Sequence, residues 1–170
     1  TLAGYGEFGG SFIYPMGDDL VTVGFVAGLE ARDVEFSVHD VLQEFKTHRL
    51  VWKILRGGER VAWGAKTITE GGFHSLPRQL SAPGLLLVGE GAGLVNVPRL
   101  KGIHYAIDSG RLAAEAAFRV LQRGEVPGRV GALDSYDEAL HGSSLWKELY
   151  EVRNMRQAFD KGFFVGGTLA

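Results

Sequence analysis

The segment GLLLVGEGAGLVNVPRLKGIHYAIDSGRLAAEAAF, residues 84–118, limits the fold more than any other part of the sequence. It begins with an unbroken apolar run, Leu85–Val88, which is typical of a strand covered on both faces near the centre of a sheet. The run stops at Gly89 and Glu90, and a loop of glycine, proline and basic residues follows. A long alanine-rich helix is then predicted to begin near Gly102. Strand, loop and helix in this order predict one βα unit.

The predicted βα unit places two groups where they would suit one ligand. Glu90 would lie at the carboxyl edge of the sheet, where ligands bind in open α/β folds, and its carboxylate would accept hydrogen bonds from sugar-like hydroxyls. The helix end at Gly102 offers free backbone N–H groups and a partial positive charge. A flavin fits, because it joins a polyol chain to a ring with an electron-rich carbonyl. The spacing alone also fits an ordinary buried βα unit.

The predicted helix has an apolar stripe rich in small residues, which would let it pack closely against a sheet. We expect the helix to end at Gly124, because glycine favours the left-handed position after a helix, and Pro127 follows shortly afterwards. The stripe consists of Ile103, Ala106, Ile107, Gly110, Ala113, Ala114, Ala117, Phe118 and Leu121.

The rest of the chain is predicted to mix strands with short helices. Two apolar, β-branched and aromatic runs separated by Gly-Asp-Asp predict a β-hairpin that pairs Gly9–Met16 with Leu20–Leu29. Periodicity and capping signals predict the other elements. These are a helix capped by Ser37, a helical turn over 51–55, a strand over 59–68, and helices over 132–140 and 145–159.

The composition excludes several classes of function. Hydrophobic residues make up 45% and charged residues 22% of the 170 residues, which predicts a packed core. The net charge of −2 gives no electrostatic footprint for nucleic acid. The sequence has no cysteine, so this segment offers no disulfide, thiolate zinc site or iron–sulfur ligand, and we predict no metal site in it. The start at Thr1 and the apolar run up to Ala170 favour a segment of a longer protein.

Four blocks of the sequence resemble one family of flavoproteins. They are FGGSFIYPM, RGGERVAWGAKTITEGGFHSLP, GLLLVGEGAGLVNVPRLKGIHYAIDSGRLAAE and LWKELYEVRNMR. In this order they are similar to electron transfer flavoprotein–ubiquinone oxidoreductase, from Phe8 almost to Ala170. The resemblance implies a parent protein that passes electrons from reduced electron transfer flavoprotein, through FAD and one 4Fe–4S cluster, to ubiquinone in the membrane.

The resemblance also implies a fold and a division of the chain. The parent would have an α/β fold like that of glutathione reductase and the aromatic hydroxylases, and this segment would be α+β. Residues 1–82 would belong to the antiparallel sheet of the quinone-side domain. Residues 83–124 would form the second half of the FAD domain, with its last strand and helix. Residues 125–170 would be C-terminal helices leading to a segment that contacts the membrane.

Individual positions match the family's motifs. Gly89 and Glu90 match the second FAD motif, which implies that Glu90 reaches the ribityl hydroxyls. Gly102 and Ile103 match the helix start beneath the flavin pyrimidine ring, where the family often has Thr in place of Ile103. Gly9 and Gly10 match a glycine pair that lies against the ubiquinone head group; the preceding residue, often Tyr in the family, is Phe8 here. No catalytic residue is identified.

Two parts of the family pattern are not in the sequence: the N-terminal glycine-rich motif that binds the FAD pyrophosphate, and the cysteines of the cluster. We therefore expect the segment alone to be inactive. The apolar end GFFVGGTLA resembles the start of a surface that enters one bilayer leaflet. This implies peripheral or monotopic attachment to a membrane, on the cytoplasmic face in a bacterium.

Two alternative functions remain open at this stage. One is a FixC-like or geranylgeranyl reductase-like flavoprotein with another electron acceptor. The other is a non-redox binding module. Flavin absorbance of the full-length protein would distinguish a flavoprotein from a non-redox binding module. A quinone-reduction assay would distinguish electron transfer flavoprotein–ubiquinone oxidoreductase from a flavoprotein with another acceptor.

Overall fold

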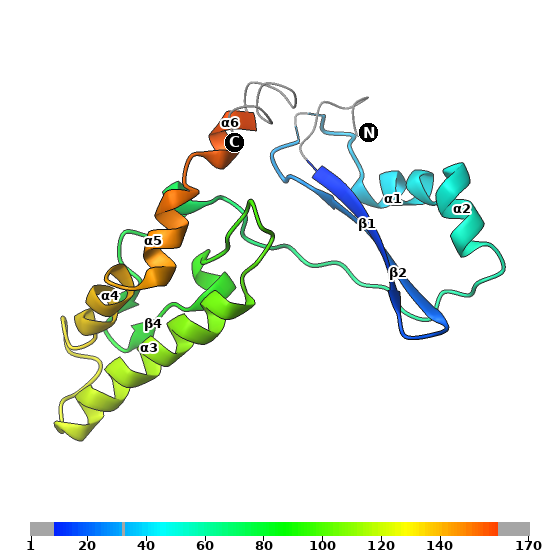
Figure 1. Cartoon of the computed structure of the whole chain (residues 1–170). Helices are drawn as coiled ribbons and strands as arrows, with labels where there is room; N and C mark the ends of the chain where they lie inside the picture. The colour runs from blue at the N-terminus through cyan, green and yellow to red at the C-terminus, as the bar shows by residue number, and fades with distance from the viewer. Residues whose placement is uncertain (1–8, 32, 160–170) are drawn as a thin grey trace. The chain divides into compact units, whose positions relative to one another are not determined.

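The computed structural model describes residues 9–31 and 33–159, and they form helices together with small antiparallel sheets, an α+β arrangement. The chain divides into two compact units, residues 1–64 and 65–170 (Figure 1). The three functional segments predicted from the sequence, 1–82, 83–124 and 125–170, concern the full-length protein and remain a prediction.

Unit 1 is built on a β-hairpin. Strand β1 (Gly9–Met16) pairs antiparallel with β2 (Leu20–Ala27), in a register that sets Gly9 opposite Ala27 and Met16 opposite Leu20. The hairpin prediction is therefore confirmed, with the second strand ending two residues early. On its outer face the rings of Phe12 and Tyr14 stack with centroids 5.6 Å apart.

Two helices follow the hairpin. Helix α1 (Val38–Thr47) begins after Ser37, whose hydroxyl oxygen accepts a hydrogen bond from the Asp40 amide at 3.3 Å, as the capping pattern predicted. The Phe45 ring packs 6.3 Å from that of Phe25 on β2, so α1 covers one face of the hairpin. Helix α2 (Arg49–Leu55) confirms the predicted second helical turn.

The predicted strand over 59–68 is wrong. No strand is assigned between residues 58 and 72, and Trp63 is 82% exposed. Alternating apolar residues form a strand only where a neighbouring strand supplies hydrogen bonds and a packing surface. Among the described residues the two sheets have two strands each, and neither pairs with this segment.

Unit 2 is dominated by one long helix and the shorter helices that cover one side of it (Figure 1). A small ladder pairs β3 (Ser81–Ala82) with β4 (Leu85–Leu86). The helical elements in chain order are η2 (Phe73–Ser75), η3 (Gly89–Ala92), α3 (Ile103–Gln122), α4 (Asp134–His141), α5 (Ser144–Glu151) and α6 (Met155–Phe159).

The apolar run at residues 85–88 is not the covered central strand that the sequence predicted. Only Leu85 and Leu86 are in a strand, their single partner among the described residues is β3, and Leu85 is 52% exposed. A run that is apolar on both faces needs strands and helices on every side to bury it. Within the described residues these neighbours are not present.

Helix α3 begins and ends where the sequence predicted. Gly102 is the N-cap residue, and Gly124 follows the C-cap with a φ of +69°, in the left-handed region that favours glycine. The two helices predicted over 132–140 and 145–159 appear as α4 and α5, with a break after Glu151 before α6 begins.

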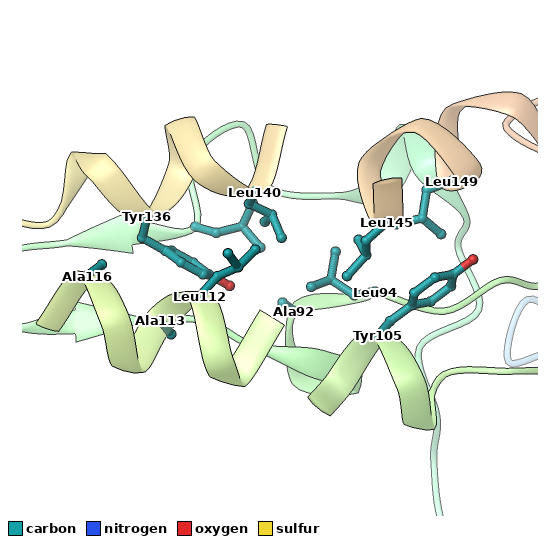
Figure 2. Packing of buried hydrophobic residues seen from close by; sticks show 11 residues of the cluster. Ala92, Leu94, Tyr105, Leu112, Ala113, Ala116, Tyr136, Leu140, Leu145 and Leu149 are labelled. Carbon is teal, nitrogen blue, oxygen red and sulfur yellow. The ribbon is translucent and has the colours of Figure 1, made fainter. Parts of the chain in front are cut away.

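The core of unit 2 lies between α3, the loop before it, and helices α4 and α5 (Figure 2). Each fully buried leucine of this kind contributes about 1.5–3 kcal/mol relative to an exposed one. The buried cluster comprises Leu80, Ala92, Leu94, Tyr105, Leu112, Ala113, Ala116, Tyr136, Leu140, Leu145 and Leu149.

The side of α3 that packs on this core is not the predicted stripe. Tyr105, Ser109, Leu112, Ala116 and Val120 are buried, and of the predicted stripe only Ala113 joins them. The helix is apolar on two sides, so its periodicity does not determine which one faces the core. The large members of the predicted stripe lie exposed along the helix; they are Ile103, Ile107, Phe118 and Leu121.

A third side of α3 is charged. Arg111 pairs with Asp108 at 2.8 Å and with Glu115 at 2.7 Å, and Arg119 pairs with Glu115 at 3.3 Å. These pairs are spaced by three or four residues on one side of the helix, which is the expected geometry for a solvent-facing row. Helix α3 thus has a core side, an exposed apolar side and a charged side.

No helix within residues 9–31 and 33–159 combines the length and apolar character needed to cross a membrane. The apolar run GFFVGGTLA, on which the sequence prediction of membrane contact rests, lies outside the described residues. That prediction stays untested.

Candidate functional site

The predicted FAD-binding residues come from two elements of unit 2 that pack against each other, η3 and the first turns of α3. Gly89 opens η3 with a φ of +57°, and its amide donates to the Ser109 hydroxyl oxygen at 3.0 Å. A Cβ at residue 89 would lie 2.9 Å from the Cβ of Ala106, which is too close. Gly89 therefore lets the backbone of η3 approach α3 at Ala106 and Ser109.

Glu90 is partly buried, and its carboxylate already has one partner. Its Oε1 accepts a hydrogen bond from the Thr69 amide at 3.3 Å. This contact fixes the carboxylate to Thr69, in the loop between α2 and η2. A carboxylate held through one oxygen can still accept from a ligand hydroxyl through the other, because each oxygen carries its own lone pairs.

The N-terminus of α3 is open on the side of its backbone amides. Within the described residues no side chain caps the helix at Gly102, and the first bond within the helix runs from the Ala106 amide to the Gly102 carbonyl at 2.8 Å. The amides of the first turn are thus left for solvent or a ligand. Ile103, the next residue, is 81% exposed.

Gly102 also has a packing reason to be glycine. A Cβ at this position would lie 3.3 Å from Cγ2 of Val95 and 3.6 Å from the Leu94 carbonyl oxygen. The first distance is tight, so Val95 would have to shift by a few tenths of an ångström. This contact within the protein is a reason for glycine at position 102 that does not depend on a ligand.

Sequence reasoning missed a polar network beside this helix end, in which Asn96 and Tyr105 are buried and Glu148 is partly buried. Two hydrogen bonds form the network. Asn96 Nδ2 donates to the Tyr105 hydroxyl at 3.2 Å, and that hydroxyl donates to Glu148 Oε2 at 2.7 Å. Burial raises the pKa of the Tyr105 hydroxyl; the Asn96 bond opposes this and Glu148 adds to it. The hydroxyl is therefore neutral at physiological pH and acts as a donor. No short-range motif signals a network whose members are so far apart in the sequence.

An aromatic cluster holds the loop 71–75 onto α5. The Phe73 ring meets Trp146 edge-on at 5.1 Å and Tyr150 at 5.4 Å between centroids. His74 Nε2 lies 3.5 Å from Asn154 Oδ1. Trp146 therefore packs against this loop. The loop before the small ladder is thus fixed to the same helices as the N-terminus of α3.

The predicted quinone-binding pair lies in unit 1, on the first strand of the hairpin. Gly9 and Gly10 stand opposite Ala27 and Val26, and both glycines are exposed. Among the described residues, a Cβ at residue 10 would meet no atom within 4 Å, so the backbone there is open with respect to them. Phe8, the residue that replaces the family's usual Tyr, lies outside the described residues.

Comparison with known proteins shows which proteins this chain is similar to. The family model described as "ETF-QO, ubiquinone-binding" matches residues 4–68, which include the hairpin and both exposed glycines. Three relatives to which the chain is similar are named as oxidoreductases.

The relatives to which the chain is similar share one protein name. The chain is 42% identical over 163 residues to "Electron transfer flavoprotein-ubiquinone oxidoreductase, mitochondrial" of Oryza sativa subsp. japonica, covering 96% of this chain and 27% of that protein. It is also 42% identical to the protein of that name in Rattus norvegicus, covering 88% of this chain and 25% of that protein. The "probable" counterpart in Saccharomyces cerevisiae is likewise 42% identical, with coverages of 89% and 26%. The chain is thus similar to electron transfer flavoprotein–ubiquinone oxidoreductases and spans about a quarter of the length of these relatives.

Proposed function

We propose that the full-length protein containing this segment oxidises reduced electron transfer flavoprotein and reduces ubiquinone. The observation that carries the proposal is the 42% identity across 96% of this chain to a relative whose name states that activity. The match of residues 4–68 to a ubiquinone-binding family model supports the same conclusion independently of any one relative.

Unit 2 would contribute to an FAD site at the junction of η3 and α3, within a fold like that of glutathione reductase. When bound, FAD supplies the redox chemistry. The first-turn amides after Gly102 would donate to a carbonyl of its ring system, and each such contact with a helix end contributes about 0.3–1 kcal/mol. Glu90, held by the Thr69 amide, would accept a ribityl hydroxyl. The residues fit such a group because the helix end is uncapped and the carboxylate is only partly engaged.

Unit 1 would contribute backbone contacts to the quinone. The open backbone at Gly10 lets a planar head group lie against the strand, since no Cβ stands in the way. The 4Fe–4S cluster would be bound by residues outside this segment, which has no cysteine. Attachment to the membrane would be peripheral or monotopic, and we expect the excised segment to have no electron-transfer activity.

The proposal is tested by a quinone-reduction assay on the full-length protein. Reduced electron transfer flavoprotein is supplied as donor and a soluble ubiquinone analogue as acceptor. We expect turnover that depends on both. A flavin-containing protein that reduces no quinone would favour a FixC-like or geranylgeranyl reductase-like function, and a purified protein without flavin absorbance would favour a non-redox module.

The placement of the helix end beneath the flavin needs a sharper test, because Gly102 also packs on Val95. We propose Gly102→Ala in the full-length protein, alone and combined with Val95→Ala, which removes the 3.3 Å contact. If the new Cβ meets the flavin, FAD binding is weakened in both backgrounds. If it meets only Val95, the double variant regains normal FAD binding, and the placement of the flavin at this helix end is wrong.

A further inference from the structure

We infer that Asn96, Tyr105 and Glu148 are positioning residues for the N-terminus of α3: together they hold the loop that sets the orientation of the open helix amides. This inference rests on the proposed FAD site. The three residues need not touch the cofactor, because they act by holding the loop before the helix in place.

Asn96 closes the loop that leads into the helix. Its side-chain Oδ1 accepts from the Arg99 amide at 3.2 Å, and its backbone exchanges hydrogen bonds with Lys101, at 2.8 Å and 3.2 Å. The loop therefore ends directly before Gly102, the N-cap of α3. Asn96 itself is 2% exposed, whereas its partners Arg99 and Lys101 lie at the surface.

The loop contains a backbone conformation that its surroundings must hold in place. Leu100 has a φ of +50°, the one positive φ found on a non-glycine residue among the described part of the chain. Such a conformation is unfavourable for a residue with a branched side chain and persists where neighbouring contacts fix it. The two backbone bonds between Asn96 and Lys101 enclose Leu100 and provide this constraint.

Tyr105 ties the closed loop to two helices. The residue lies in the first turn of α3 with its ring buried beside Leu94, and Leu149 of α5 belongs to the same cluster (Figure 2). Its hydroxyl accepts from Asn96 and donates to Glu148 on α5. Loop, α3 and α5 are thus joined at one oxygen atom. A hydrogen bond to a carboxylate is stronger than one between neutral groups, so the Glu148 bond fixes the hydroxyl that Asn96 uses as its acceptor.

Loss of the Tyr105 hydroxyl would release the loop without removing the core. The Asn96 amide would lose its acceptor in a buried place, and the side chain would turn away or admit water. The loop before Gly102 would then adopt several arrangements, and the first-turn amides would no longer be preorganised for a ligand. The ring of a phenylalanine would still fill the same space.

The test uses the full-length holoprotein and two readouts, the FAD dissociation constant and the thermal midpoint. We expect Tyr105→Phe and Glu148→Ala each to raise the dissociation constant about tenfold, the equivalent of one hydrogen bond to a charged group. Glu148→Gln should stay close to wild type, because its amide oxygen still accepts from the tyrosine. The double variant Tyr105→Phe with Glu148→Ala should resemble either single variant, since both break the same connection.

The matched control is Tyr136→Phe, which removes another buried tyrosine hydroxyl from unit 2. That hydroxyl donates to the Leu87 carbonyl at 2.7 Å and takes no part in the network. We expect the control to lower the thermal midpoint and leave FAD affinity unchanged. Equal behaviour of Tyr136→Phe and Tyr105→Phe, with FAD affinity unchanged in both, overturns the inference and leaves the proposed function standing. A wild-type protein that binds no FAD overturns both.

Discussion

The buried carboxylate of Asp137 offers the most direct test of how unit 2 is held together. Its two oxygens accept hydrogen bonds from the Leu80 amide at 2.7 Å and the Ser81 amide at 3.1 Å. Leu80 and Ser81 are both buried, so neither amide can turn to water instead. Asp137 therefore fixes the segment before β3 onto α4.

The expected loss in the free energy of unfolding follows from the hydrogen bonds that Asp137→Ala would remove. Two buried amides would lose their acceptor, at about 1–3 kcal/mol each. Asp137 also lies in the first turn of α4, where a negative charge contributes about 0.3–1 kcal/mol. We expect a total loss of about 3–5 kcal/mol in the free energy of unfolding. Asp137→Asn should lose about half as much, because its amide oxygen can still accept one of the two bonds.

The assay is urea unfolding followed by far-ultraviolet circular dichroism. A loss of 3 kcal/mol or more should lower the midpoint by roughly 1–2 M. Amide exchange at Leu80 and Ser81 should also become faster in the variant. The control is Glu138→Gln, an exposed neighbour on the same helix, which we expect to change stability by less than about 0.5 kcal/mol. If Asp137→Ala is no more destabilising than this control, the carboxylate does not hold the segment.

Three further predictions concern single residues. Gly89→Ala should destabilise unit 2 more than Gly124→Ala, because both have a positive φ but only the first would bring a Cβ within 2.9 Å of Ala106; thermal unfolding of the two variants compares them. Burial raises the pKa of Tyr136 to about 12, above its ordinary value near 10, so the contribution of this tyrosine to stability should be fully present below pH 10 and be lost as the pH rises toward 12. An ultraviolet titration should show this late-ionising tyrosine, and Tyr136→Phe should remove it. In the full-length protein, Gly10→Leu should slow quinone reduction more than flavin reduction, and rapid-reaction measurements that find both half-reactions slowed equally would contradict a quinone site at the hairpin.

Local signals in the sequence were sufficient for the elements whose stability is local. The hairpin, the Ser37 cap and the ends of α3 at Gly102 and Gly124 depend on turn and capping residues within a few positions, and all are confirmed. The strand predicted over 59–68 fails for the opposite reason. Its stability would depend on a neighbouring strand, and alternation along one segment carries no information about whether that neighbour exists.

The contacts that hold the candidate site were beyond sequence reasoning for a different reason. Asp137 appears in the sequence as an ordinary helix-surface carboxylate, yet it is buried because its partners are backbone amides 56 and 57 residues away. Asn96 and Glu148 likewise carry no pattern that connects them. Of the four predicted FAD-binding residues, Glu90 and Gly102 follow from the βα pattern, whereas Gly89 and Ile103 were found through a family resemblance. The roles of all four remain proposals.

The three-sided character of α3 has a practical consequence for protein engineering. With about 100° between successive residues, the exposed apolar residues, the ion-paired row and the core residues occupy separate sectors of the helix. Polar replacements at Ile107 and Phe118 should therefore increase the solubility of an isolated unit 2 without disturbing Tyr105 or Ala116. In the full-length protein, the same replacements would show whether another part of the protein covers the exposed apolar side of α3. If it does, substitutions should be tolerated mainly in the row of charged residues.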